Sequence, residues 1–313
     1  MSSPIGRSPR FDISVPPTGY HWWYVDAISD DGVYGVSIIA FIGSVFSPYY
    51  AWRGRHNPQD HVCVNVAVYG PGVKRWTMTE RGERALSRDR TNLWIGPSHV
   101  HWDGTSITVD FDEVGMPLPR RARGRLRLTP KWTNDEVFAL DGRGRHQWWP
   151  IAPVCRAEVS LTEPQLNWTG HGYFDSNWGD EPIENGFHRW DWSRARLPDE
   201  GAAILYDVER LDQTRHSIAI AFDKSGTVRH FDPAPRQDLG NTFYRVPRFT
   251  QCESDFQARV VETFEDTHFY QRSHIETKLC GEIVPAMHES MALYRFRTGW
   301  AKMLLPFKMP RRA

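Results

Sequence analysis

The sequence predicts an all-β protein, for three reasons. Short stretches of partly alternating hydrophobicity recur along the chain, bounded by Gly, Pro, Asp or Asn, as is typical of strands in antiparallel sheets. Helix signals are scarce by comparison. Aromatic residues make up 13% of the chain, with 14 tryptophans, and aromatic side chains favour strands. The length of 313 residues suits two β-domains or one large β-barrel.

The first informative stretch is the uncharged segment Gly32–Trp52, which is long enough to cross a bilayer. Gly35, Gly43 and Pro48 interrupt it, and its apolar centre, Val36–Phe46, is rich in β-branched residues. These features favour one buried strand over a membrane span.

The remaining strand signals follow in chain order. The predicted strands are His61–Tyr69, Ser106–Asp112, Arg123–Leu128, Ala202–Glu209 and Ser217–Phe222. The predicted hairpin turns are Asp103-Gly104, Asp141-Gly142 and Ser225-Gly226. Both patterns support the all-β prediction in each half of the chain.

Charge and cysteine usage exclude several classes of protein. Lys plus Arg and Asp plus Glu both number 38, so no net basic charge favours nucleic acid. The four cysteines are widely spaced and form no CxxC pair, which indicates free thiols rather than a zinc site or a disulfide framework. Met1–Pro17 lacks the apolar core of a signal peptide, so export is not expected. These counts predict no oligomeric state.

Chemistry-bearing residues gather in the segment Gly170–Arg194, which holds five carboxylates, two histidines and three tryptophans. If residues 187–192 are extended, His188, Trp190 and Trp192 share one face. A row of one imidazole and two indoles predicts the wall of an apolar cavity with a polar end. The segment lies where one β-domain would pass to the next, and pockets often form at such junctions.

Two further stretches predict pocket residues. An extended Tyr20–Ala27 places Trp22, Tyr24 and Asp26 on one face, as a second wall. Tyr206 and Asp207 point to opposite faces of their strand, so we expect only one of them to reach the pocket. Histidine pairs such as His99 and His101 have no third ligand nearby, so no metal site is expected.

Several long strings resemble the carotenoid 1,2-hydratase (hydroxyneurosporene synthase) family. They are GYHWWYVDAISDDG, SIIAFIGSVFSPYYAW, MTERG, RHQWWPIAP, GYFDSNWGDEP, FHRWDWSRA, LYDVERLD and MLLPFKMPRR. The resemblance runs from about Gly19 to the C-terminus. It implies two lipocalin-like β-barrel domains packed together, which we place at residues 1–182 and 183–313.

The resemblance also implies a reaction: water adds to the terminal 1,2 double bond of an acyclic carotene such as neurosporene or lycopene, without a cofactor. Two alternatives remain open. One is a terpenoid cyclase of the same fold, in which an internal double bond rather than water captures the cation. The other is a carrier that holds a carotenoid in a barrel without converting it.

Such a hydration needs a strong acid, a stabilised cation and an ordered water. The candidate catalytic residues are Asp175, His188, Tyr206, Asp207, Asp180 and Glu181. The candidate substrate-binding residues are Trp22, Tyr24, Asp26, Tyr173, Trp178, Trp190 and Trp192, with Asp26 as a reserve acid. Structural alternatives are an Asx turn at Asp175, an exposed acidic loop at 180–181, a core histidine at 188 and packing tryptophans at 190 and 192.

A long acyclic carotene resides in a membrane, so we expect a cytoplasmic protein that associates peripherally with the inner or intracytoplasmic membrane. Arg123, Arg125 and Arg127 would share one strand face, which is typical of a solvated surface, or could bind anionic headgroups. The C-terminal Trp300–Arg312 mixes apolar and basic residues. It could lie at a membrane interface or pack back on the barrel.

Overall fold

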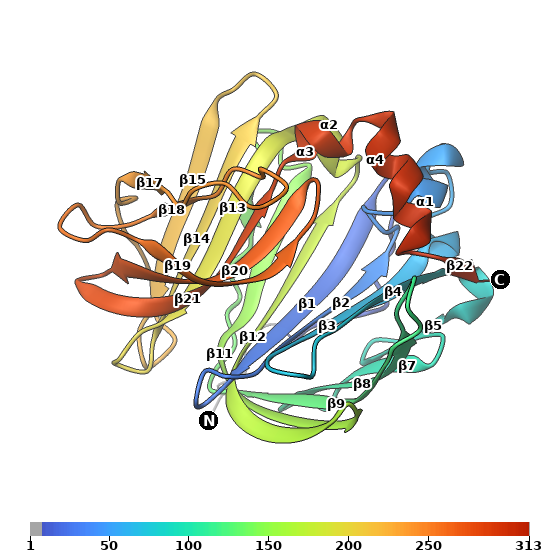
Figure 1. The fold of residues 1–313 in the computed structure, drawn as a ribbon, viewed down its shortest axis with the longest axis horizontal. Coiled ribbons are helices and arrows are strands. Elements are labelled where there is room, and N and C mark those ends of the chain that lie inside the picture. Colours follow the sequence, from blue (N-terminus) through green and yellow to red (C-terminus); the bar gives the residue numbers. More distant parts are fainter. Residues whose placement is uncertain (1–7, 313) are drawn as a thin grey trace. The chain divides into compact units, whose positions relative to one another are not determined.

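The computed structural model describes residues 8–312, and strands dominate it (Figure 1), which confirms the all-β prediction. The chain divides into two compact units, Met1–Pro182 with Lys302–Ala313, and Ile183–Ala301. The expected second domain ran to residue 313, but the structure assigns the last residues to the first unit. They return there because β22 (Arg311–Arg312) pairs in parallel with β4 (Arg75–Arg81).

One 13-stranded sheet makes up the first unit. Besides β4 and β22, its strands are β1 (Tyr20–Ser29), β2 (Gly35–Ile42), β3 (Val62–Tyr69), β5 (Leu86–Arg88), β6 (Asn92–Ile95), β7 (Ser98–Trp102), β8 (Ile107–Val114), β9 (Arg121–Pro130), β10 (Phe138–Ala139), β11 (His146–Glu163) and β12 (Gln165–Gly179). Its order is β22-β4-β3-β2-β1-β12-β11-β9-β8-β7-β6-β5, with β10 beside β11. β4 also contacts β8 and β9, so the sheet curls on itself as a lipocalin-like barrel does.

Strand alternation divides this sheet into two chemically different faces. Val25, Ile38, Val64 and Phe174 point into the apolar core of the first unit. Their neighbours along each strand point the other way and include polar and aromatic groups such as Asp26. β1 and β12 therefore contribute to the core with one face and to a buried polar surface with the other.

A seven-stranded sheet forms the second unit, in the order β16-β15-β14-β13-β21-β20-β19. Its strands are β13 (Phe187–Arg196), β14 (Ala202–Arg210), β15 (Arg215–Phe222), β16 (Val228–His230), β19 (Arg259–Asp266), β20 (Tyr270–Leu279) and β21 (Glu282–Met291). The pair β17 (Arg236–Asp238) and β18 (Phe249–Gln251) is a separate ladder, and β18 contacts both β13 and β20. This curled sheet is the half-barrel of the second unit.

Helices are few and short: α1 (Pro48–Trp52), α2 (Ile183–Gly186), α3 (Leu293–Phe296) and α4 (Gly299–Leu304), with 3₁₀ turns at Pro58–Asp60, Glu83–Ala85 and Leu305–Phe307. The stretch Gly32–Trp52 forms β2 and α1, which confirms the strand interpretation. Across residues 8–312, no helix has the length and apolar character that crossing a membrane requires. All four cysteines are free, as expected.

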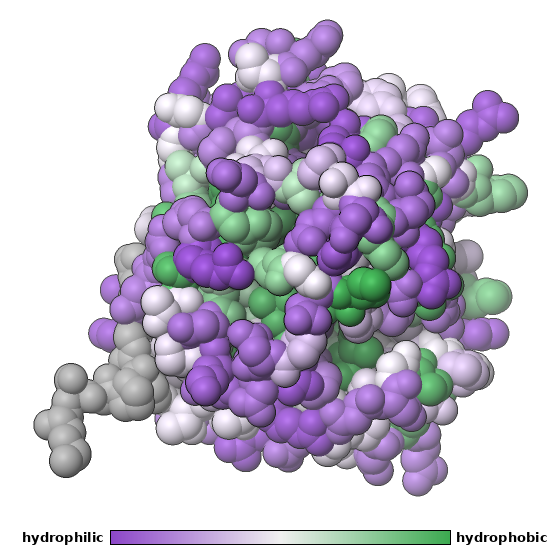
Figure 2. Space-filling view, turned by 90° about the vertical axis from the view of Figure 1, so that its left-hand side faces the viewer, coloured by the Kyte–Doolittle hydropathy of each residue, from purple (hydrophilic) through white to green (hydrophobic). Residues whose placement is uncertain are grey.

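The arginine-rich strand β9 has a solvated, neutralised face. Arg125 forms a bidentate ion pair with Asp110 of β8 at 2.6 and 3.0 Å, and Arg121 pairs with Asp112 in the same way. Since the adjacent strand supplies matching carboxylates, this face offers little net charge to a headgroup. Hydrophilic side chains cover most of the surface seen in Figure 2, with hydrophobic ones between them near its centre. Scattered apolar exposure of that kind is ordinary.

Candidate active site

Two adjacent strands of the first unit each carry a Tyr-x-Asp sequence on the face opposite the apolar core. In the antiparallel register, Tyr24 of β1 lies opposite Asp175 of β12, and Asp26 lies opposite Tyr173. All four side chains are buried. We call these four residues the Tyr–Asp cluster.

Hydrogen bonds within each strand fix the carboxyl groups of the Tyr–Asp cluster. The Tyr24 hydroxyl donates to Asp26 Oδ2 at 2.8 Å, and the Tyr173 hydroxyl donates to Asp175 Oδ2 at 2.8 Å. Asp175 Oδ2 accepts a second bond, from Trp148 Nε1 of β11, at 2.9 Å. Because two donors converge on Oδ2, a proton carried by this carboxyl group must reside on Oδ1.

Aromatic rings extend the buried surface along β1. Trp22 is buried and stacks on Tyr20, with ring centroids 5.0 Å apart. The Tyr20 hydroxyl shares a hydrogen bond of 2.9 Å with His146 Nδ1 of β11. Burial lowers the pKa of His146, so near neutral pH its imidazole is uncharged.

Burial raises the pKa of Tyr173 well above its ordinary value, and Asp175 raises it further when its carboxyl group is ionised. The phenol therefore remains protonated and keeps donating to Asp175 throughout the physiological range. A buried carboxyl group held by two donors, with a second carboxyl group one strand away, can deliver a proton and be stabilised as the carboxylate that remains.

Three residues expected from the sequence lie elsewhere in the first unit. Asp180 and Glu181 follow the end of β12, where Arg145 pairs with both, at 2.8 and 3.1 Å. Asp180 is exposed, as the acidic-loop alternative proposed. Trp178 lies on the core side of β12, where it stacks with His21 at 5.5 Å. Because Trp178 is an odd number of residues from both Tyr173 and Asp175, its side chain points to the opposite face of β12.

The second unit holds the other predicted residues. Trp190 and Trp192 are buried and share a face with Tyr206, whose ring lies 6.2 Å from that of Trp190. His188 does not share this face. It stacks on Tyr294 at 4.6 Å, and its Nε2 lies 4.0 Å from Glu209 of β14. The register of β13 against β14 shifts between residues 187 and 189, and this irregularity breaks the alternation on which the prediction depended.

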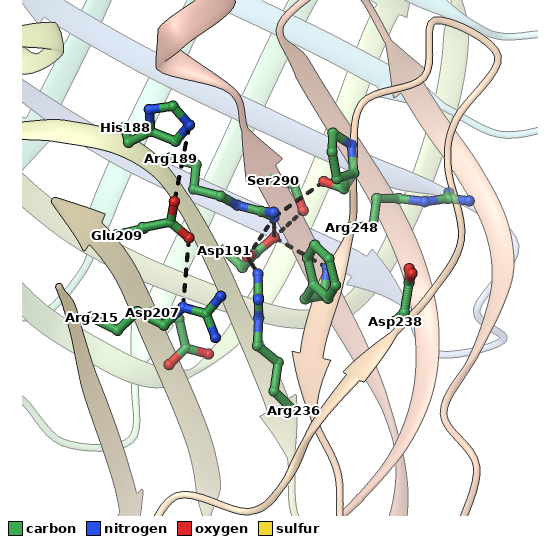
Figure 3. Close-up of polar contacts among 12 residues, drawn as sticks. His188, Arg189, Asp191, Asp207, Glu209, Arg215, Arg236, Asp238, Arg248 and Ser290 are labelled. Atoms are coloured by element: carbon green, nitrogen blue, oxygen red, sulfur yellow. Dashed lines mark hydrogen bonds and ion pairs between the residues drawn. The ribbon is translucent and has the colours of Figure 1, made fainter. Parts of the chain in front are cut away.

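Figure 3 shows where the opposite face of β13 and β14 gathers polar groups. Asp191 lies at the centre, with Arg189 Nη2 at 2.9 Å, Arg236 Nη2 at 3.3 Å and the Ser290 hydroxyl also bonded to it. Asp207 points to the same side as Asp191 and away from Tyr206, as strand alternation predicts.

Asp207 itself is bonded by Gln251 Nε2 at 2.8 Å. Burial raises the pKa of Asp207, and the charge of Asp191 adds to the effect. The cavity beside them has a volume of about 130 Å³ and is lined by arginine and carboxylate side chains. Such a volume suits a few water molecules, each of which occupies about 30 Å³ in the liquid, rather than a hydrocarbon chain. The cavity beside Asp191 and Asp207 is therefore a poor fit for a carotene, and the Tyr–Asp cluster remains the candidate site on the arrangement of its carboxyl groups.

Two contributors near the Tyr–Asp cluster escaped the sequence analysis, Trp148 and His146. Both lie in the string RHQWWPIAP, which supported the family resemblance but was given no role in the site. The repeated Tyr-x-Asp sequence was a usable signal, because two such repeats on paired strands can place their carboxyl groups on one face. Among the described residues, no three or more His, Cys, Asp or Glu side chains are grouped as metal ligands would be.

Comparison with known proteins identifies the family. The family model described as "Carotenoid hydratase CrtC" matches residues 38–313. The chain belongs to the carotenoid hydratase family. This membership confirms the resemblance found in the sequence and the predicted enzyme class, a hydro-lyase.

Curated relatives within this family cover nearly the whole chain. The acyclic carotenoid 1,2-hydratase of Thiocapsa roseopersicina is 53% identical over 309 residues, which span 97% of this chain and 76% of the relative. The protein of the same name from Rubrivivax gelatinosus is 50% identical over 311 residues, 98% of this chain and 77% of the relative.

Solved structures with low sequence identity share the fold. A protein from Nitrosomonas europaea assigned as AttH gives a TM-score of 0.60 at 15% identity, over 92% of this chain and all of that one. Kievitone hydratase from Nectria haematococca gives a TM-score of 0.56 at 11% identity, over 89% of this chain and 90% of that one. At such identities, the likeness concerns the lipocalin-like fold that the family resemblance implied, which is thereby confirmed.

Proposed function

We propose that this protein is an acyclic carotenoid 1,2-hydratase and that the Tyr–Asp cluster carries out the chemistry. The observation that supports the proposal best is Asp175, a buried carboxyl group held by Tyr173 and Trp148 with a second carboxyl group, Asp26, one strand away. The substrate would be an acyclic carotene such as neurosporene or lycopene, and the product a tertiary alcohol.

In the first step, the Asp175 carboxyl group transfers its proton to C2 of the terminal 1,2 double bond. The π electrons form the new C2–H bond, and C1 becomes a tertiary cation. The two donors on Oδ2 stabilise the carboxylate that remains, so they strengthen the acid at the moment of transfer. Buried indole and phenol rings such as Trp22 and Tyr24 can face the cation.

In the second step, a water oxygen bonds to C1 and the bound water loses one proton. Asp26, oriented by the Tyr24 hydroxyl, is the group proposed to receive that proton. Return of a proton to Asp175 completes the cycle, so the net reaction consumes one alkene and one water. These two reaction steps require no cofactor.

A carotene is insoluble in water, so the enzyme is proposed to act at the cytoplasmic side of the inner or intracytoplasmic membrane, as a peripheral protein. Only one end of the extended substrate has to leave the bilayer for the reaction at C1 and C2.

The test is an incubation of purified protein with lycopene or neurosporene, dispersed in detergent in deuterated water with no added cofactor. A product heavier by one water and carrying deuterium at C2, formed by the wild type and lost in Asp175→Asn, supports the proposal.

Two other outcomes would replace the proposal with the alternatives raised by the sequence. A product that gains no water but carries deuterium at C2 would indicate a terpenoid cyclase, because an internal double bond has then captured the cation and the ring product has lost a proton. Pigment that binds in stoichiometric amount but is recovered unchanged would indicate a carrier.

A further inference from the structure

A run of apolar side chains faces solvent near the C-terminus, although its spacing is that of a buried helix face. Trp300, Met303, Leu304 and Phe307 follow the i, i+3, i+4, i+7 pattern through α4 and the following 3₁₀ turn. All four are exposed, and Met303 and Phe307 are exposed to 67% and 70%. Helices with this pattern normally bury such a stripe, so its exposure indicates a surface with a function.

Trp300 belongs to a chain of aromatic rings within the second unit. The ring of Trp300 lies 4.8 Å from that of His268, which lies 4.4 Å from that of Tyr244. Tyr244 in turn contacts Phe243 at 5.2 Å, and Phe243 is 89% exposed. We call the four exposed side chains of the continuous segment 300–307, Trp300, Met303, Leu304 and Phe307, the apolar strip.

Basic residues accompany the apolar strip. From Ala292 to Ala313 the sequence contains six arginines and lysines and no aspartate or glutamate. Within the second unit, Arg295 donates to the carbonyl oxygens of Tyr244, at 2.8 Å, and Arg245, at 2.7 Å. This differs from β9, whose arginines are matched by aspartates of β8. Arg311 is ion-paired with Asp60 and Glu80, so the positive charge of the C-terminal segment comes from its other five basic residues.

We infer that the apolar strip is the surface by which the protein docks on an anionic phospholipid bilayer. The inference rests on the proposed function, because a carotene substrate must be drawn from a membrane. Trp, Tyr and Phe side chains favour the boundary between headgroups and acyl chains, and basic residues next to them bind anionic headgroups. α3 and α4, red in Figure 1, would lie along that boundary.

The sequence left open whether the C-terminal segment lies at a membrane interface or packs back on the barrel. In this proposal, different parts of the segment do each. Residues 300–307 present the strip, whereas Met309 is buried and β22 pairs with β4. The guanidinium group of Arg311 bonds Asp60 Oδ2 at 2.9 Å and also contacts the buried Glu80. This anchor fixes the end of the strip to the first unit, so docking requires no folding of a loose tail.

The test compares three proteins by co-sedimentation with vesicles of phosphatidylcholine alone or mixed with phosphatidylglycerol, at low and high salt. They are the wild type, Met303→Ser/Phe307→Ser and the control Leu118→Ser. Leu118 is 68% exposed on the β8–β9 hairpin, so the control removes an equally exposed apolar side chain. We expect salt-sensitive binding of the wild type and the control to the mixed vesicles. The double variant should partition at least about tenfold less.

Equal binding of the double variant and the wild type would overturn the inference, as would no wild-type binding. So would a wild-type dimer in light scattering without vesicles that the double variant abolishes, because the strip would then join two copies. Hydration of detergent-dispersed lycopene, measured on the same proteins, separates this test from that of the proposed function. Full activity of the double variant together with lost vesicle binding supports both proposals. The expected pattern of vesicle binding, together with no hydration by any of the three proteins, supports the role of the apolar strip and counts against the proposed hydratase function.

Discussion

At Asp175, two neutral donors converge on one carboxylate oxygen, and both come from aromatic side chains that are themselves buried. Protonating an unactivated alkene needs a strong acid, and hydrogen bonds to the conjugate base supply acid strength without adding a positive charge. The indole and phenol donors therefore stabilise the carboxylate that the proposed proton transfer would leave.

The first prediction concerns that acid. Asp175→Asn keeps the side-chain shape but leaves no transferable proton, so the hydration rate should fall by roughly 10²- to 10⁴-fold. Turnover of lycopene per mole of folded protein measures the effect. Asp180→Asn is the matched control, since Asp180 is exposed and paired with Arg145. A similar loss in both variants would remove Asp175 from its proposed role.

The second prediction separates the Trp148 donor from its ring. Trp148→Phe removes Nε1–H, and a hydrogen bond to a charged group contributes about 1.5–3 kcal/mol, so turnover should fall roughly 10- to 100-fold. The adjacent Trp149 donates to the backbone carbonyl of Asn134 at 2.7 Å. Trp149→Phe should lower thermal stability but spare the turnover of the folded fraction. Unchanged turnover in Trp148→Phe would show that its N–H does not support the acid.

Residue types were easier to predict than residue roles. The sequence indicated Asp175, Tyr173, Tyr24 and Asp26 because acids and aromatics stand out in apolar strings. It could not indicate that β1 and β12 are neighbours, since their pairing joins segments about 150 residues apart. Trp148 escaped for a different reason: β11 and β12 are consecutive in the chain, but its donor role depends on the exact register of their pairing, in which Trp148 lies opposite Asn177.

Among the elements, β12 shows how one strand serves two purposes. Phe174 and its alternate neighbours pack into the core, while Tyr173 and Asp175 belong to the Tyr–Asp cluster. The alternation of side chains along a strand made this division predictable. Tyr206 and Asp207 of β14 point to opposite faces, as this alternation predicts. His188 did not, because an irregularity in β13 depends on how β14 pairs with it and leaves no mark in composition.

A third prediction belongs to β22, the short strand that returns to the first unit. Arg311→Met leaves the buried Glu80 without its guanidinium partner and should lower the free energy of unfolding by about 3 kcal/mol. Arg312→Met, at an exposed position of the same strand, should change it by less than about 0.5 kcal/mol. Urea unfolding of both variants provides the measurement. Equal effects would mean that the strand contributes through its backbone alone.

For the whole molecule, buried histidines limit stability in acid. Burial lowers the pKa of His21 to about 3, and the charge of Arg88 contributes. The unfolded chain binds a proton at this residue below its ordinary pKa of about 6.5, and the folded protein does not. The stabilisation from the neutral imidazole is therefore complete above that pH and is lost as the pH falls toward 3.

The fourth prediction follows from that sign. His21→Gln can keep a hydrogen bond to Ser176, which His21 Nε2 meets at 2.7 Å, but it cannot titrate. Its free energy of unfolding should decline less steeply than that of the wild type below pH 6.5, by up to about 1.4 kcal/mol per pH unit. Urea titrations from pH 4 to 8 would show it. Parallel curves over that range would assign the acid sensitivity to other groups.

The antiparallel pairing of β1 and β12 gives the Tyr–Asp cluster an approximate local dyad. A half-turn about an axis between Val25 and Phe174 exchanges Tyr24 with Tyr173 and Asp26 with Asp175. The flanking strands break this symmetry, since β11 presents Trp148 to Asp175 whereas β2 places Ser37 opposite Asp26. In the proposed mechanism, the strands that carry neither carboxyl group would thus decide which one serves as acid and which as base. Exchanging the two roles would require substitutions on β11 and β2 rather than at the carboxyl groups.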